Sequence, residues 1–234
     1  MKLLKTIFLL HLIFIPTMNA QSLSVGLGGG FSSMQPEQYE SFTYQNSSFN
    51  NYTWSGKFVE LKDQKNDQGL NYSGYFRYGL PILPVNIIAG FQYCQYTGSA
   101  GNVTVESPPW SSLMYTNGVL KTKKEMVSIN VGVQWEISSS FITPYLSFQA
   151  MANRFSETSL EIKTNFGNLY EEAKTEKKSR YGAAVGAGAK VNLLPGISSN
   201  LEINYSANNI SPREDAEKAI NSVSLNLLFF YQLF

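Results

Sequence analysis

The sequence predicts an all-β protein, built as one eight-stranded, antiparallel, up-and-down transmembrane β-barrel. Three observations support this prediction. The chain begins with the pattern of a secretory signal. Eight later segments alternate apolar with small polar residues at a period of two, which is typical of strands with two different faces. The connections between these segments alternate between long and short, as they do in barrels that cross a membrane.

The N-terminal stretch MKLLKTIFLLHLIFIPTMNA combines Lys2 and Lys5 with an apolar run and ends on the small residue Ala20. This pattern predicts a signal peptide at residues 1–20 and leaves residues 21–234 for the barrel. Cleavage removes two lysines and lowers the formal net charge from +1 to −1, a balance that gives no indication of nucleic acid binding.

The alternation places the strands along the rest of the chain. We expect them at residues 22–33, 69–80, 85–97, 124–137, 141–154, 179–193, 200–209 and 219–233. In the fourth of these, Val127, Ile129 and Val131 share one face, and Ser128, Asn130 and Gly132 share the other. Residues 34–68 and 210–218 also lie between strands, but their polar composition predicts loops.

The connections fall into two classes. Three are short and rich in turn residues, at 81–84, 138–140 and 194–199. Four are longer and polar, at 34–68, 98–123, 163–178 and 210–218. Strict alternation of the two classes is expected when both termini lie in the periplasm, with short turns inside and longer loops outside.

The segment RYGAAVGAGAKVNLL, residues 180–194, resembles at first sight a phosphate-binding loop. Both phosphate motifs fail, because Lys190 is followed by Val191 where a P-loop needs Ser or Thr and the Rossmann fingerprint needs Gly. Every second residue instead falls on one of two faces, so the segment is a strand, and its glycines all lie on the polar face.

The polar faces decide which side of the barrel meets lipid. A soluble barrel of the lipocalin kind would place its polar face in water, and such faces usually carry Lys, Glu and Thr. Here the polar faces are dominated by Gly, Ser, Asn and Gln. Small polar residues suit the interior of a narrow eight-stranded barrel, and the opposite aliphatic and aromatic faces suit hydrocarbon.

The signal peptide, the eight strands and the aromatic-rich ending LNLLFFYQLF resemble the small eight-stranded OmpA and OmpX-like barrels. The resemblance covers the whole mature chain and is architectural. It implies a bacterial outer-membrane location, contact with membrane lipid and lipopolysaccharide, and recognition of the C-terminal strand by the barrel-assembly machinery through Phe234. In this chain Phe234 is out of phase with Phe229 and Tyr231.

Enzymes among the small barrels, such as those that modify lipid A, use a histidine in the active site. The only histidine of this chain is His11, inside the predicted signal peptide, so the mature chain lacks the usual base. Cys94 is the single cysteine and forms no intramolecular disulfide; without a histidine it is more easily explained as a packed thiol. We therefore assign no catalytic, cofactor-binding or metal-binding residue, and expect no enzyme activity.

An interior charge cluster is expected near the periplasmic end. It comprises Arg77, Glu136, Lys190 and Glu202. All four lie on the polar face and close to a short turn, so they should sit at similar depth. With a turn at 195–198, Lys190 should lie opposite Glu202 or Asn204. The cluster could form a gate or a salt-bridged plug, because buried charges need partners.

The long loops are rich in aromatic residues. Those that could contact a surface partner are Tyr44, Tyr52, Trp54, Trp110 and Tyr115. Aromatics among Asn, Ser and Thr are typical of recognition loops. The alternative is that the FTY and KFVEL segments of residues 34–68 only extend the neighbouring strands above the membrane. The sequence leaves open whether residues 34–68 add a further strand pair.

Three classes of function remain open on the sequence alone. The first is a non-enzymatic surface protein that supports the outer membrane or contacts a host or other partner through its loops. The second is a passive channel for small, hydrophobic solutes, as in OmpW-like barrels. The third is a lipid A-modifying enzyme, which the missing histidine disfavours.

Overall fold

The computed structural model describes residues 22–35, 43–49, 52–62, 65–81, 83–98, 101–137, 141–171, 178–211 and 219–233. The predicted signal peptide and the C-terminal Phe234 lie outside the described residues. Among the described residues, no helix is long and apolar enough to cross a membrane.

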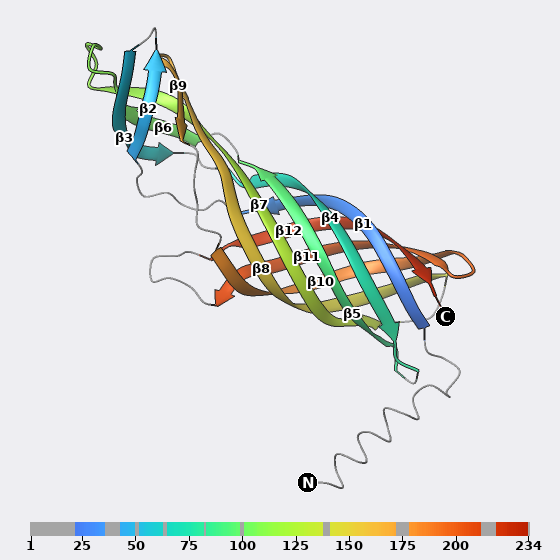
Figure 1. Ribbon diagram of the computed structural model, residues 1–234. Helices are drawn as coiled ribbons and strands as arrows, with labels where there is room; N and C mark the ends of the chain where they lie inside the picture. Colours follow the sequence, from blue (N-terminus) through green and yellow to red (C-terminus); the bar gives the residue numbers. More distant parts are fainter. Residues whose placement is uncertain are drawn as a thin grey trace, which may run out of the picture.

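Eight strands close into an antiparallel barrel, as the sequence predicted (Figure 1). Around the barrel they are β1 (Ser22–Met34), β4 (Asp67–Gly79), β5 (Val85–Thr97), β7 (Tyr115–Glu136), β8 (Ile142–Thr164), β10 (Lys178–Leu194), β11 (Ile197–Ser211) and β12 (Asn221–Gln232). The β1–β12 and β7–β8 pairings complete the ring. A closed ring leaves no strand edge in the membrane, where an unpaired backbone group would be costly.

The two faces of the barrel wall are those that the alternation predicted. In β1, Leu27 and Phe31 are each 70% exposed on the outside, whereas Ser24 and Ser32 are buried inside. In β12, Leu225, Leu227 and Phe229 face outward, and Ser222, Ser224 and Asn226 are buried. The outer face is therefore a continuous apolar surface, and the inner face lines a lumen.

Both ends of the described chain lie at the short-turn end of the barrel (Figure 1). The connection between β10 and β11 is tighter than predicted, because only Pro195 and Gly196 separate the paired residues Leu194 and Ile197. Gly196 has a φ of 77°, in the left-handed region that glycine adopts without steric cost. The prediction of a turn over 194–199 was too long, and the inward-facing Ser198 belongs to β11.

At the opposite, long-loop end the wall continues into a folded structure that we call the β-extension. It contains β2 (Thr43–Phe49), β3 (Tyr52–Lys62), β6 (Gly101–Glu106) and β9 (Gly167–Glu171), together with the distal parts of β7 and β8. The pairing runs β2–β3–β6–β7–β8–β9, and β9 also lies against β2. In β7, the eight residues 115–122 precede the first pair with β5. At ~3.3 Å per residue the extension therefore follows this strand for about 26 Å.

The β-extension answers a question that the sequence left open, namely whether residues 34–68 add strands or only extend existing ones. Residues 43–44 of FTY and 57–61 of KFVEL do not continue β1 or β4, and Phe42 lies outside the described residues. Residues 43–44 and 57–61 belong to β2 and β3, which pair with each other, and β3 also pairs with β6. The physical reason is that β7 and β8 rise beyond their barrel neighbours and expose backbone donors and acceptors, on which further strands can pair.

The β-extension has its own apolar core. Val103, Val105, Leu120 and Ile162 are each at most 2% exposed. Their strands alternate these residues with more exposed ones such as Asn102, so the interior face of the barrel wall continues upward as an apolar face. Burial of branched aliphatic side chains stabilises the extension as a rigid unit.

Candidate functional site

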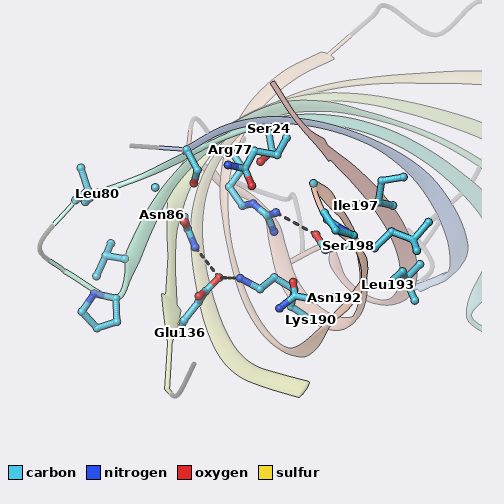
Figure 2. Close-up of a pocket in the computed structure, with 18 of the residues that line it drawn as sticks. Ser24, Arg77, Leu80, Asn86, Glu136, Lys190, Asn192, Leu193, Ile197 and Ser198 are labelled. Atoms are coloured by element: carbon cyan, nitrogen blue, oxygen red, sulfur yellow. Dashed lines mark hydrogen bonds and ion pairs between the residues drawn. The ribbon is translucent and has the colours of Figure 1, made fainter. Parts of the chain in front are cut away.

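The lumen at the short-turn end holds an ion pair between two strands that are not neighbours. Lys190 Nζ, on β10, lies 2.6 Å from Glu136 Oε1, on β7. Asn86 Nδ2, on β5, donates to the same oxygen over 3.0 Å (Figure 2). The ion pair therefore spans β8, which lies between β7 and β10, whereas the contact from Asn86 joins the neighbouring strands β5 and β7.

Arg77, on β4, occupies a different environment. Its side chain is buried, with 7% of the residue exposed, and its guanidinium carbon lies 4.1 Å from the centre of the Phe230 ring. Nη2 donates a 3.2 Å hydrogen bond to Ser198 Oγ, whereas Nη1 has no hydrogen-bond partner. Stacking on an aromatic face and a single hydroxyl contact therefore fix the plane of the guanidinium.

Glu202, on β11, is 5% exposed and is held by two hydroxyl groups. Tyr145 donates to Oε2 over 2.7 Å, and Ser147 donates to Oε1 over 3.2 Å. The expectation that Lys190 faces Glu202 or Asn204 was wrong. Lys190 pairs in register with Asn200. The observed turn has two residues instead of the predicted four, so each residue of β10 pairs with a residue of β11 that comes earlier in the sequence than expected.

A pocket of about 630 Å³ opens at the short-turn end (Figure 2). Arg77, Glu136 and Lys190 all line it, together with small polar residues that include Ser22, Ser24, Asn86 and Asn192. Glu202 does not line the pocket. The structure thus brings three residues of the predicted interior charge cluster to one cavity and places the fourth against Tyr145.

Beyond this pocket the lumen is filled by two apolar clusters that the sequence analysis missed. The lower cluster is Tyr75, Leu228 and Phe230, and the upper cluster is Met34, Cys94, Tyr96, Met126 and Ile220. The signal for the lower cluster was present in LNLLFFYQLF, where the apolar residues run through both faces of the strand. A small void of about 10 Å³ lies between the clusters.

The inward glycines make room for these side chains. A Cβ at Gly26 would come within 2.6 Å of the Phe230 ring, and one at Gly188 would come equally close to Tyr145. At Gly186 it would overlap Asn204 and Ser147 and lie 3.0 Å from Glu202 Oε1. The small polar face that the sequence showed is therefore the space into which larger residues of neighbouring strands pack.

The predicted surface-contact aromatics all fall in the β-extension or its hairpin tip. Tyr44 belongs to β2, Tyr52 and Trp54 belong to β3, and Tyr115 begins β7. Trp110 lies in the β6–β7 connection and, like Tyr115, is 43% exposed.

The connection at residues 107–114, which we call the tip, carries further exposed apolar residues that the sequence analysis did not single out. Leu113 is 58% exposed and Met114 is 76% exposed. Its backbone is ordered by hydrogen bonds from Ser111 N to the Pro108 oxygen and from Ser107 N to the Met114 oxygen. The sequence SPPWSSLM contains no charged residue. An ordered, uncharged tip with exposed aromatic and aliphatic side chains is typical of an interaction surface.

The described part of the chain contains no group of three or more His, Cys, Asp or Glu side chains arranged to hold a metal ion.

Comparison with known protein families identifies the family that has this architecture. The family described as outer membrane protein beta-barrel domain matches residues 8–229. The chain belongs to this family. Outer membrane protein β-barrel domains reside in the bacterial outer membrane, and so does this protein. The short turns of such barrels face the periplasm and the longer loops face outward, so the charged pocket is periplasmic and the β-extension is extracellular.

Solved structures similar to this outer membrane protein β-barrel come from several bacteria. The attachment invasion locus protein Ail of Yersinia pestis is 15% identical, with 92% of this chain and 99% of that chain covered and a TM-score of 0.43. OprG from Pseudomonas aeruginosa is 12% identical, with 92% and 98% covered and a TM-score of 0.45. A major outer membrane protein from Thermus thermophilus is 12% identical, with 92% and 100% covered and a TM-score of 0.46. No curated protein matches the sequence significantly.

Proposed function

We propose that this protein is a non-enzymatic outer-membrane barrel with a side-chain-filled lumen, which contacts a surface partner through its β-extension and so acts at the cell surface or in outer-membrane integrity. The main support for the proposal is the exposure of apolar side chains at the tip. Trp110, Leu113 and Met114 are exposed there, on a rigid extension with its own apolar core. Exposed apolar side chains on an ordered scaffold lose little conformational entropy on binding, which favours a contact role.

Replacing the tip side chains tests this proposal. In a Gram-negative host that displays the protein, we expect Trp110→Ser/Leu113→Ser/Met114→Ser to reduce adherence to cultured epithelial cells by about tenfold, since clustered aromatic and aliphatic anchors dominate such contacts. Adherent cells are counted against wild type and empty vector, and sensitivity to SDS with EDTA reports outer-membrane integrity in the same strains.

The matched control is Asn117→Ser/Lys121→Ser, at two exposed positions on the side of the same extension. It should adhere like wild type. If cells with the wild-type protein neither adhere better nor resist SDS with EDTA better than the empty-vector strain, the proposed function is wrong. If the tip variant keeps full adherence, the contact lies elsewhere on the extension.

A passive channel is the second candidate, favoured by the periplasmic pocket that enters the lumen. The two apolar clusters above this pocket support a closed lumen instead. In planar bilayers we expect no discrete openings from wild type, and none from Glu136→Ala, because the clusters stay in place when the Lys190 ion pair is lost. Discrete openings of wild type that change in size in Glu136→Ala would support the channel.

The absence of histidine from residues 21–234 supports a non-enzymatic role. Lipid A mass spectra from cells with and without the protein provide the check. A lipid A species that depends on the protein would favour the enzyme.

A further inference from the structure

Arg77 is a buried cation that forms no ion pair with a described carboxylate. No described carboxylate lies within ion-pair distance of its guanidinium, whose contacts are the Ser198 hydroxyl and the Phe230 ring. The Nη1 group makes no hydrogen bond at all. A buried charge is costly unless it is paired, so an anion at this position would stabilise the site.

The other charges of the pocket are already compensated. The ammonium of Lys190 contacts Glu136, and this carboxylate also accepts from Asn86. Glu202 lies outside the pocket lining, with each of its oxygens holding a hydrogen bond from a hydroxyl group. The described charged residues that line the pocket, Arg77, Lys190 and Glu136, therefore sum to a formal charge of +1, and a monoanion would neutralise this excess.

The pocket has the size and lining of a small-molecule site. Its volume of about 630 Å³ lies within the range of ligand cavities, roughly 300 to 1,000 Å³. It opens toward the periplasm, and Ser22, Ser24 and Ser198 line it. The Ser198 hydroxyl accepts a hydrogen bond from the arginine (Figure 2). Phe230 fixes the guanidinium plane before any ligand arrives, which reduces the entropy lost on binding.

We propose that this pocket binds a small organic carboxylate from the periplasm, with Arg77 as its anchor. A carboxylate is planar and carries one negative charge, and it matches the paired donors of a guanidinium in a bidentate arrangement. The carboxylate belongs to a free small acid or to the C-terminus of a periplasmic peptide. This inference is independent of the extracellular contact role.

Arginine side-chain NMR on the full barrel in nanodiscs tests the proposal. N-acetylglycine is titrated at constant ionic strength, with neutral N-acetylglycinamide as the isosteric control and tri-alanine as the peptide probe. We expect a saturable shift of the Arg77 Nε–Hε resonance with N-acetylglycine or tri-alanine and none with the amide. The tighter of the two acids identifies the source. Absence of a saturable shift with both acids overturns the proposal.

Three variants sharpen the test. Arg77→Gln should weaken binding about tenfold or more, since hydrogen bonds between charged groups are stronger than those between neutral groups. Binding to this variant is measured from the NMR signals of the labelled ligand. Arg180→Gln removes another buried arginine that does not line the pocket, and should bind like wild type. If Arg77→Gln does not fold, Glu136→Gln still tests the proposal. This variant removes the negative charge that neutralises Lys190, so the pocket becomes more positive and should bind the carboxylate several-fold more tightly. Unchanged or weaker binding in Glu136→Gln overturns the proposal.

Discussion

Gly30→Val is expected to prevent closure of the barrel. Gly30 faces inward on β1 and pairs with Asn226 of β12, at the seam between the first and last barrel strands. A Cβ at this position would overlap the backbone oxygen of Leu225 and lie 2.8 Å from Asn226 Oδ1. A backbone atom cannot swing away as a side chain can, so the cost should exceed the roughly 1–3 kcal/mol typical of an overpacked core.

The measurement is the fraction of protein that refolds into lipid vesicles, followed as the shift in gel mobility between unheated and heated samples. The matched control is Ala152→Val on β8, where a small residue faces outward and is exposed. The control should refold like wild type, because added methyl groups there meet only lipid. Equal refolding of Gly30→Val and Ala152→Val would contradict the idea that the inward glycines are required by packing.

The barrel was predictable because alternate residues in the sequence of each wall strand show which face meets lipid and which face lines the lumen. In RYGAAVGAGAKVNLL the inward glycines alternate with the outward Ala, Val and Leu, so that each face repeats every two residues and no knowledge of neighbouring strands is needed. The short turns could likewise be predicted from their Pro and Gly residues. A one-residue slip would have put Val185 and Val191 into the lumen, which is why the face assignment was robust.

The contacts within the lumen were not predictable in the same way. Lys190 and Glu136 lie on strands separated by β8, so their ion pair depends on the curvature of the closed ring. Lys190 was expected opposite Glu202 because a four-residue turn was assumed. The observed turn, which contains Gly196 at a positive φ, has two residues, so the register of the two strands differs from the expected one. The β-extension was left undecided for a related reason, since β3 pairs with β6, which is distant from it in sequence.

The second large effect is expected at the extracellular end of the lumen, where Lys124 Nζ lies 3.6 Å from Asp67 Oδ2. Only 9% of the lysine side chain and 3% of the aspartate side chain are exposed. Lys124→Met removes this partner from a buried carboxylate, and we expect a loss of about 3–5 kcal/mol in the free energy of unfolding. Urea unfolding in lipid vesicles, followed by tryptophan fluorescence, measures it.

Two further variants separate the charge effect from lost packing. Lys163→Met breaks the pair with Glu161, whose side chains are 49% and 21% exposed, and should cost at most about 1 kcal/mol. Asp67→Asn/Lys124→Met removes both charges, so it should recover a large part of the stability lost in Lys124→Met. The single variant Asp67→Asn completes the comparison. If the stability lost in the double variant equals the summed losses of Asp67→Asn and Lys124→Met, the two residues do not act as a pair. The stability of the extracellular end of the lumen would then depend on packing around Tyr96 and Met126, rather than on charge.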